Sequence, residues 1–315
     1  MLRPLYPHFQ RLLVSLGVIF GAVTLIFLVL NWLPADPATL IAGETASPET
    51  VQQLRVKLGT DRPLSEQYRS YMVGLLHGDL GTSYITREPV ATRLAAQLPA
   101  TLTLTFSACL VAIVLGIGLG VLSVLYRGRW LDQAIQAASL ALVSMPQFWL
   151  GMILILIFSV RLGWLPVIGN GGFLPSILPV ATAGLWLSVP LQRMVRDGML
   201  DGLHEPYVTT LRAKGLGERR IFYVHVLRNA LTSTVTLLGV MIGESLSNAV
   251  IIETLFARQG IGRITVEAIG QKDIPVVQGA ILISSVTYVL VNLLVDLSYT
   301  VIDPRTRLVT SKGMR

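Results

Sequence analysis

The sequence predicts an all-α polytopic membrane protein with six transmembrane helices and with both termini in the cytoplasm. Of the 315 residues, 52% are hydrophobic and only 14% are charged, whereas soluble domains carry about 25% charged residues. Six nearly charge-free runs are each long enough to supply the roughly 20 apolar residues that cross a bilayer. No strong repeat or linker divides the chain, so residues 1–315 are predicted to form a single integral membrane domain.

The six runs define the predicted transmembrane helices. They are residues 12–33, 101–125, 134–160, 174–192, 230–256 and 274–302. The first run is longer than the apolar core of a signal peptide, and no small-residue cleavage site follows it, so we interpret it as a retained span. The fourth run contains Pro175, Pro179 and Pro190, and a kink is expected there because neighbouring helices tolerate one.

The distribution of Lys and Arg predicts the orientation. Positive residues gather before the first span, at Arg127 and Arg129, in the connection 193–229 and in the C-terminal tail. With six spans these regions fall on one side, and the positive-inside rule makes that side cytoplasmic. We therefore attribute the net charge of +7 to orientation and expect no nucleic-acid partner. The protein is predicted to be a multi-pass membrane protein.

Two connections are predicted to lie outside the cell membrane. Residues 36–100 form a long external (periplasmic) region whose patterns predict helices at 47–58 and 64–76, with Ser47 and Pro48 typical of a helix start. The second external connection, residues 257–273, is expected to hold a short helix.

Several catalytic and binding patterns are missing from the sequence. It holds no G-x-x-x-x-G-K-[ST] phosphate loop, no H-E-x-x-H and no G-x-S-x-G. The four histidines lack the spacing of metal ligands, and the single cysteine, Cys109, cannot form an internal disulfide. We therefore expect neither an enzyme nor an ATPase, and no cofactor or metal.

The basic stretch 201–231 stands out because it lies between two apolar runs. Pro206 suits the first position of a short helix, and Gly215 and Gly217 suit its end. An amphipathic helix in a water-facing loop indicates contact with a soluble partner. The residues expected to make that contact are Tyr207, Val208, Leu211, Arg212, Lys214, Gly215, Arg219 and Arg220. A second helical pattern follows, in which Ile221, Val224, Leu227 and Leu231 are spaced for one face.

Polar residues inside the predicted spans suggest a pathway. Glu244 lies in the middle of the fifth run with Ser247 and Asn248 nearby, and a carboxyl group in hydrocarbon should face a cavity or a partner. These three residues are the candidate pathway residues, and an interhelix hydrogen bond is the alternative role for Glu244. In the second run, Gly116, Gly118 and Gly120 indicate close contact with another helix.

Short motifs throughout the chain resemble the membrane-spanning permease subunits of ABC importers for dipeptides, oligopeptides and nickel. These motifs are 33–38 (LPADPA), 78–84 with Pro89-Val90, 144–149 (SMPQFW), 162–166 (LGWLP), 207–215 with Glu218-Arg219-Arg220, 260–263 (GIGR), 273–279, 291–296 (VNLLVD) and 303–305 (DPR). Their order and spacing make the resemblance specific. In the family's cytoplasmic signature, E-A-A-x-x-x-G followed by I-x-L-P, Gly215 and Leu227 match, whereas Thr209, Thr210, Leu211 and Arg228 depart from it.

The resemblance implies a type I ABC importer permease fold, a location in a bacterial inner membrane and a division of labour. Such a subunit forms half of a pathway together with a second homologous permease, as an expected hetero-dimer. Two cytoplasmic ATP-binding subunits would dock on residues 193–229, the coupling loop, and an external solute-binding protein would deliver peptides or a related solute such as nickel, glutathione or a metallophore. The alternatives are an ion-coupled secondary transporter without ATPase partners, and a membrane scaffold.

Overall fold

The protein is helical throughout the part of the chain that the structure, a computed structural model, describes. Those residues are 6–32, 37–43, 46–169 and 172–302. Within them every regular element is a helix, and the only strand-like pairing is an isolated bridge between Thr82 and Pro89. The all-α prediction is thereby confirmed. Residues 1–5 and the tail 303–315, whose charges entered the orientation prediction, lie outside the described residues, as do residues 33–36 of the first family motif.

Each predicted span coincides with a helix or a helix pair. Five helices are long and apolar enough to cross a membrane, and one bent pair raises the number to six if it counts as one span. The five helices are α1 (Tyr6–Trp32), α5 (Val90–Leu125), α8 (Phe173–His204), α11 (Leu227–Leu255) and α13 (Ile274–Ile302). The pair joins α6 (Trp130–Ser144) to α7 (Gln147–Leu154), which continues as a π-helical segment, η1 (Ile155–Arg161).

The third predicted span differs from expectation because it is broken. The two helices of the pair are bent by 111° at Met145 and Pro146. Proline lacks an N–H donor and pushes the residue before it out of the helical region, and Met145 is extended, with φ −102° and ψ 139°. By contrast, α8 continues through Pro179 and Pro190. It also ends at His204, well beyond the predicted end at residue 192.

The chain divides into two compact units, and α5 and α13 contribute to both. The first unit contains residues 1–101 and 259–289. It includes α1, α2 (Pro37–Ala42), α3 (Pro48–Leu58), α4 (Leu64–Leu76) and α12 (Ile261–Gly270). Helices α3 and α4 match the two predicted external helices, and Ser47 caps α3 by accepting the Thr50 N–H at 3.3 Å.

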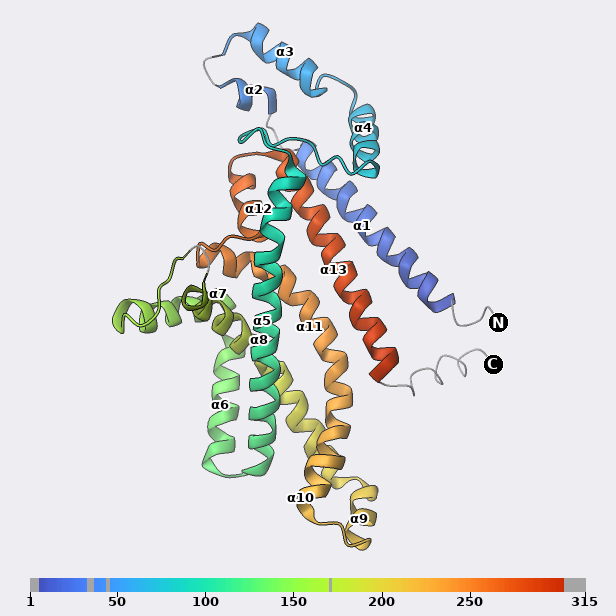
Figure 1. The fold of residues 1–315 in the computed structure, drawn as a ribbon, viewed down its shortest axis with the longest axis vertical. Coiled ribbons are helices and arrows are strands. Elements are labelled where there is room, and N and C mark those ends of the chain that lie inside the picture. Colours follow the sequence, from blue (N-terminus) through green and yellow to red (C-terminus); the bar gives the residue numbers. More distant parts are fainter. Residues whose placement is uncertain (1–5, 33–36, 44–45, 170–171, 303–315) are drawn as a thin grey trace. The chain divides into compact units, whose positions relative to one another are not determined.

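Aromatic contacts fasten α4 to α1 within the first unit (Figure 1). The Phe27 ring packs on Tyr68 and Tyr71, with ring centroids 5.2 Å and 5.5 Å away. The Thr24 hydroxyl lies 2.7 Å from the Tyr68 hydroxyl. Helix α4, in the predicted external region, is thus anchored on α1.

A buried polar network secures the loop before α5. Asp273, which directly precedes α13, is fully buried. Its carboxylate accepts one hydrogen bond from the Ser83 hydroxyl and another, at 2.9 Å, from the backbone N–H of Tyr84. Arg93 of α5 lies 3.7 Å from the same carboxylate. Nearby, a Cβ at Gly279 would lie 2.6 Å from Val90 Cγ1, so α13 and α5 touch closely. The family motifs at 78–84, 89–90 and 273–279 meet here.

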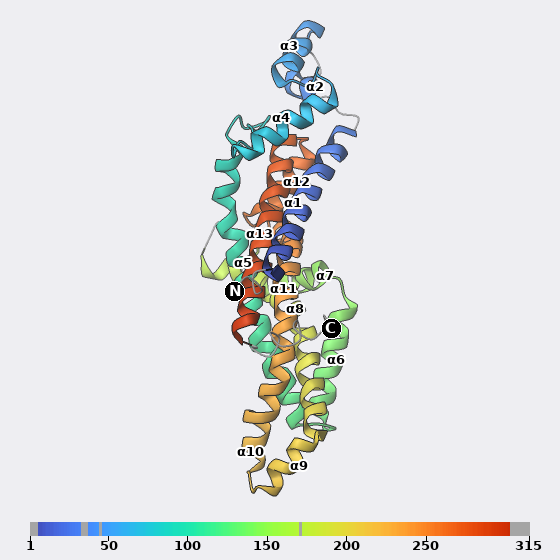
Figure 2. The same ribbon diagram turned by 90° about the vertical axis from the view of Figure 1, so that its right-hand side faces the viewer.

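The second unit contains residues 102–258 and 290–315, and its core lies between α5, α8 and α11. Helices α8 and α11 run alongside each other in both views (Figures 1 and 2). Two glycines allow α5 to approach α8: a Cβ at Gly116 would lie 2.6 Å from Leu191 Cβ, and one at Gly120 would lie 3.0 Å from the Gln192 carbonyl oxygen. A Cβ at Gly118 would meet nothing within 4 Å, so Gly118 makes no such close contact among the described residues of this chain.

Candidate coupling helix and pathway

The predicted short helix is present at one end of the second unit. Helix α9 (Pro206–Ala213) and the single turn α10 (Glu218–Arg220) connect α8 to the π-helical segment η2 (Ile221–Val226), which leads into α11 (Figure 1). Pro206 occupies the first turn, where its missing N–H does no harm. Gly215 adopts φ +79°, a left-handed conformation that glycine reaches without strain. The helix start and stop signals therefore located α9 correctly.

One face of α9 is packed into the bundle. Val208 is fully buried and belongs to an apolar cluster of the second unit. The other buried members of that cluster are Val124, Val195, Met199, Ile221, Val226 and Ala230. Tyr207 and Leu211 are half-buried against the same cluster. Val208 therefore holds α9 in place, and a partner cannot reach its side chain directly.

The opposite face of α9 and the turn after it are exposed. Thr209, Thr210, Lys214 and Gly215 all lie on the surface. Arg212 is exposed too, but its guanidinium donates two hydrogen bonds to Glu218, at 2.7 Å and 3.1 Å. These bonds lower the pKa of Glu218 and raise that of Arg212. Arg212 thus closes the turn around Gly215.

Two further cations lie beyond that turn. Arg219 and Arg220 are exposed. Within the described part of the chain neither they nor Lys214 form an ion pair. These three side chains are therefore open to a partner of opposite charge.

An ion pair between the buried Asp132 and the half-buried Arg196 ties α8 to the α5–α6 hairpin. Asp132 of α6 accepts two hydrogen bonds from Arg196 of α8, at 3.3 Å and 3.2 Å, and one from Ser123 of α5. Arg196 also donates to Ser123 at 2.9 Å, and the Gly128 N–H donates to Asp132 at 3.1 Å. The helix that leads into α9 is therefore bonded to two other helices. The sequence reading had used Arg196 only as a positive charge for orientation.

The predicted apolar face after α9 is only partly correct. Ile221 is buried, but Val224 is 49% exposed. The reason is that residues 221–226 form a π-helix, whose wider turn changes the spacing of inward-facing residues. Val226 and Ala230 take the buried positions instead.

The three candidate pathway residues lie on α11 but do not share one environment. Glu244 and Ser247 are exposed. They belong to an exposed stripe along α11 whose members are spaced alternately four and three residues apart. The stripe consists of Val240, Glu244, Ser247, Ile251 and Thr254. Asn248 is half-buried and lines a small cavity in the second unit. Two other polar residues of that cavity, Thr105 and Gln147, were not singled out from the sequence, although Pro146 marks the helix start that positions Gln147.

These features define a class of protein: a polytopic helical membrane protein with a short helix, α9, between two of its candidate spans. Among its described residues no group of three His, Cys, Asp or Glu side chains could hold a metal ion. The sequence pattern of the family described as "Binding-protein-dependent transport system inner membrane component" matches residues 88–308. That of the related N-terminal family, "Binding-prot-dependent transport system membrane comp, N-term", matches residues 1–105.

Relatives of similar length are known. A Brucella abortus (strain 2308) protein named "Putative peptide transport system permease protein" is 39% identical over 306 residues, which cover 95% of this chain and 98% of the relative. The "Glutathione transport system permease protein GsiC" of Escherichia coli (strain K12) is 37% identical over 298 residues, covering 95% and 97% of the two chains.

Solved structures share the fold. An inward-facing structure of the MetNI methionine ABC transporter matches with a TM-score of 0.54 at 20% identity, over 67% of this chain and 96% of that one. An amino acid ABC transporter matches with a TM-score of 0.52 at 15% identity, over 67% and 92%.

The chain belongs to the family of inner membrane components of binding-protein-dependent transport systems. It is a membrane-spanning permease subunit of an ABC importer, as the sequence motifs had indicated, and its location is the inner membrane.

Proposed function

We propose that this permease forms half of the pathway for a peptide or peptide-like solute, and that α9 couples it to two ATP-binding subunits. A second, homologous permease completes the pathway, and an external binding protein delivers the solute. The names of the relatives support this solute class, because they refer to peptide and glutathione transport. Glutathione is itself a tripeptide, so both names point to amide-linked solutes.

The observation that carries the coupling proposal is the two-sided packing of α9. Its inner face is fixed by the fully buried Val208, while Thr209, Thr210 and Lys214 stay exposed. A helix of eight residues is about 12 Å long, a length that suits a groove on a partner's surface. Because α9 shares its apolar cluster with α8 and α11, a force on α9 is passed to those helices as to a rigid body.

The exposed stripe of α11 supports the assignment of the pathway. A carboxylate such as that of Glu244 costs about 3 kcal/mol or more when it faces hydrocarbon. Exposure of Glu244 and Ser247 in the single subunit is therefore best explained if the second permease and the water-filled pathway cover this stripe. The 4–3 spacing also matches the contact positions of packed helices.

Isolation and reconstitution test the coupling proposal. We expect two ATP-binding chains to be isolated with the wild-type permease from native membranes. Replacing both Thr209→Glu and Lys214→Glu should reduce the amount of bound ATPase and the solute-stimulated ATP hydrolysis at least about tenfold, because the exposed face changes charge while Val208 stays packed.

The control is Lys57→Glu, which makes the same Lys-to-Glu change as Lys214→Glu at an exposed lysine on α3 in the predicted external region. It should leave ATPase binding unchanged. Full ATPase binding and uptake in the α9 double variant would exclude α9 as the coupling helix. Ion-driven uptake by the permease alone, without ATP-binding chains, would support the secondary transporter instead.

A further inference from the structure

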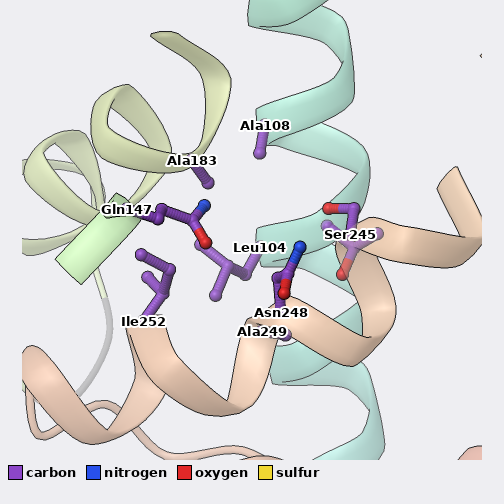
Figure 3. Close-up of a pocket in the computed structure, with 9 residues that line it drawn as sticks. Leu104, Ala108, Gln147, Ala183, Ser245, Asn248, Ala249 and Ile252 are labelled. Carbon is purple, nitrogen blue, oxygen red and sulfur yellow. The ribbon is translucent and has the colours of Figure 1, made fainter. Parts of the chain in front are cut away.

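A small cavity with both polar and apolar lining residues lies within the second unit, where four helices meet (Figure 3). Its walls come from α5, α7, α8 and α11. The lining residues are Leu104, Thr105, Ala108, Gln147, Ala183, Ser245, Asn248, Ala249 and Ile252. Its volume is about 10 Å³, which is room for about one water molecule.

Two buried side chains around this cavity have polar atoms without a partner. Thr105 is 1% exposed and Gln147 is 7% exposed. Within the described part of the chain, neither Thr105 Oγ1 nor Gln147 Oε1 has a hydrogen-bond partner. Because buried polar atoms in native proteins are nearly always hydrogen-bonded, two such atoms beside one cavity indicate that something polar occupies it.

The break in the third span places Gln147 in this position. Gln147 is the first residue of α7 and directly follows Pro146, where the chain bends by 111°. Broken helices in transporters bring the start of a half-helix to a solute site. Here the break brings an amide side chain to the cavity as well (Figure 3).

The cavity also borders the exposed stripe of α11. Asn248, which lines the cavity, is half-buried and directly follows the exposed Ser247. Asn248 therefore stands between the closed cavity and the surface that we assign to the pathway.

The chemistry of the lining selects an uncharged ligand. None of the nine lining residues carries an ionisable acid or base. Gln147 and Asn248 each present both an N–H donor and a carbonyl acceptor, and Thr105 and Ser245 present hydroxyl groups. A peptide group also offers one donor and one acceptor, so this lining complements it.

We propose that this cavity is the closed form of a solute-binding position on the pathway, and that it receives an amide group of the transported solute. The inference rests on the proposed function and adds the position and the chemical class of ligand. The cavity must widen to admit the solute, and the break at Pro146 supplies a place where α7 can move against α6.

Cysteine labelling tests whether the position lies on the pathway. Gln147→Cys and Asn248→Cys, each in the assembled complex, are exposed to the small reagent methanethiosulfonate ethylammonium with and without ATP and vanadate. We expect the labelling rate of both to change at least about tenfold between the two conditions. The wild-type chain, whose own Cys109 is buried, gives the labelling rate without an introduced cysteine. Thr182→Cys is the matched control, because Thr182 is fully buried beside Ala183 but donates to the Leu178 carbonyl instead of lining the cavity.

The outcomes of the labelling separate the inference from the proposed function. Labelling at residues 147 and 248 that exceeds the Thr182→Cys background and changes with ATP and vanadate supports the inference, and labelling that does not change between the two conditions overturns it. Absence of labelling at both positions in a complex that hydrolyses ATP overturns it, while the proposed function stands. A complex without ATP hydrolysis contradicts the proposed function itself.

Uptake measurements test the class of ligand. With radiolabelled dialanine as the probe, Gln147→Met should lower ATP-driven uptake about tenfold, because it keeps the length of the side chain but removes its hydrogen bonds. Gln147→Asn, which keeps the amide, should recover part of the loss. Unchanged uptake in Gln147→Met, or no dialanine uptake by a wild-type complex with intact ATP hydrolysis, would overturn the assignment to an amide group.

Discussion

In each unit of the permease a buried carboxylate lies beside a serine and an arginine, Asp273 in the first unit and Asp132 in the second, yet the two carboxylates are held differently. In the second unit, Asp132 receives two N–H donors of Arg196 within 3.3 Å. In the first unit, Arg93 stands 3.7 Å from Asp273, and the nearer partners of that carboxylate are the Ser83 hydroxyl and the Tyr84 backbone N–H.

Asp132 and Asp273 therefore have two different structural roles. The Asp132–Arg196 pair joins two helices by opposite charges, and the buried Asp132 needs the half-buried Arg196 as its counter-charge. Asp273 holds a loop mainly by accepting hydrogen bonds. Loss of the counter-charge should therefore be most harmful in the second unit, whereas loss of an acceptor should be most harmful in the first.

The largest effect is expected from Arg196→Met. This change leaves the Asp132 carboxylate buried without its counter-charge, and breaking a buried pair in this way costs about 3 to 5 kcal/mol. Thermal unfolding of the purified permease in detergent measures the loss. The double variant Asp132→Asn with Arg196→Met should recover much of it, because no unpaired charge remains. A single variant as stable as the wild type would show that the pair does not join α8 to the hairpin.

A smaller loss is expected from Asp273→Ala, of about 2 to 3 kcal/mol, because hydrogen bonds to a charged group are removed. Asp273→Asn should be milder, since its amide oxygen still accepts the Tyr84 N–H. Hydrogen exchange at residues 84–86 reports the release of the loop. If Asn were as damaging as Ala, the charge of Asp273, paired with Arg93, would matter more than its hydrogen bonds.

The glycine contacts provide a third test. Gly120→Ala places a Cβ 3.0 Å from the Gln192 carbonyl oxygen, so α5 must move away from α8, at a cost of about 1 to 3 kcal/mol. Gly118→Ala is the matched control, because nothing lies within 4 Å of its Cβ. In the first unit, Gly279→Ala meets the Val90 side chain rather than backbone, and we expect a smaller effect. Equal melting temperatures for the Gly118 and Gly120 variants would contradict the close approach.

The smallest effect concerns high pH and only the first unit. Burial, together with the charge of Asp273, raises the pKa of Tyr84 to about 12 from an ordinary value near 10. The raised pKa of Tyr84 stabilises the folded state fully below pH 10. This stabilisation is lost as the pH rises towards 12, because the phenol of Tyr84 ionises at a lower pH in the unfolded chain than in the folded protein. Tyr84→Phe should therefore lose less stability than the wild type between these pH values. Exposed Tyr223 supplies the control Tyr223→Phe, whose pH profile should match that of the wild type.

Much of the fold could be predicted from local signals in the sequence. Apolar length located the spans, and Ser47, Pro206 and Gly215 located helix ends because their effects act within one helical turn. Proline was less informative. Pro146 breaks a span, whereas Pro179 and Pro190 lie inside the continuous α8. Whether a proline breaks a membrane helix depends on the packing of neighbouring helices, which one sequence does not show.

The candidate sites were predictable only in part for the same reason. The sequence located α9 and its apolar face. It could not tell that Val208 on this face packs against the bundle, because an apolar face suits a partner protein as well. The pair of Asp132 and Arg196 joins residues far apart in sequence, and neither residue has a local signal for the other. Thr105 and Gln147 likewise become neighbours of one cavity only after α5 and α7 have packed.

The burial of Val208 also bears on how the importer is assembled. The cluster that fixes α9 includes Ala230 of α11, a helix made later than α9 during synthesis. Until α11 has packed, α9 lacks part of its support, and the surface that we propose for docking is incomplete. If ATP-binding chains are recruited through α9, they would bind only to permeases in which α11 has already packed. Association of the ATP-binding chains would then follow folding of the permease.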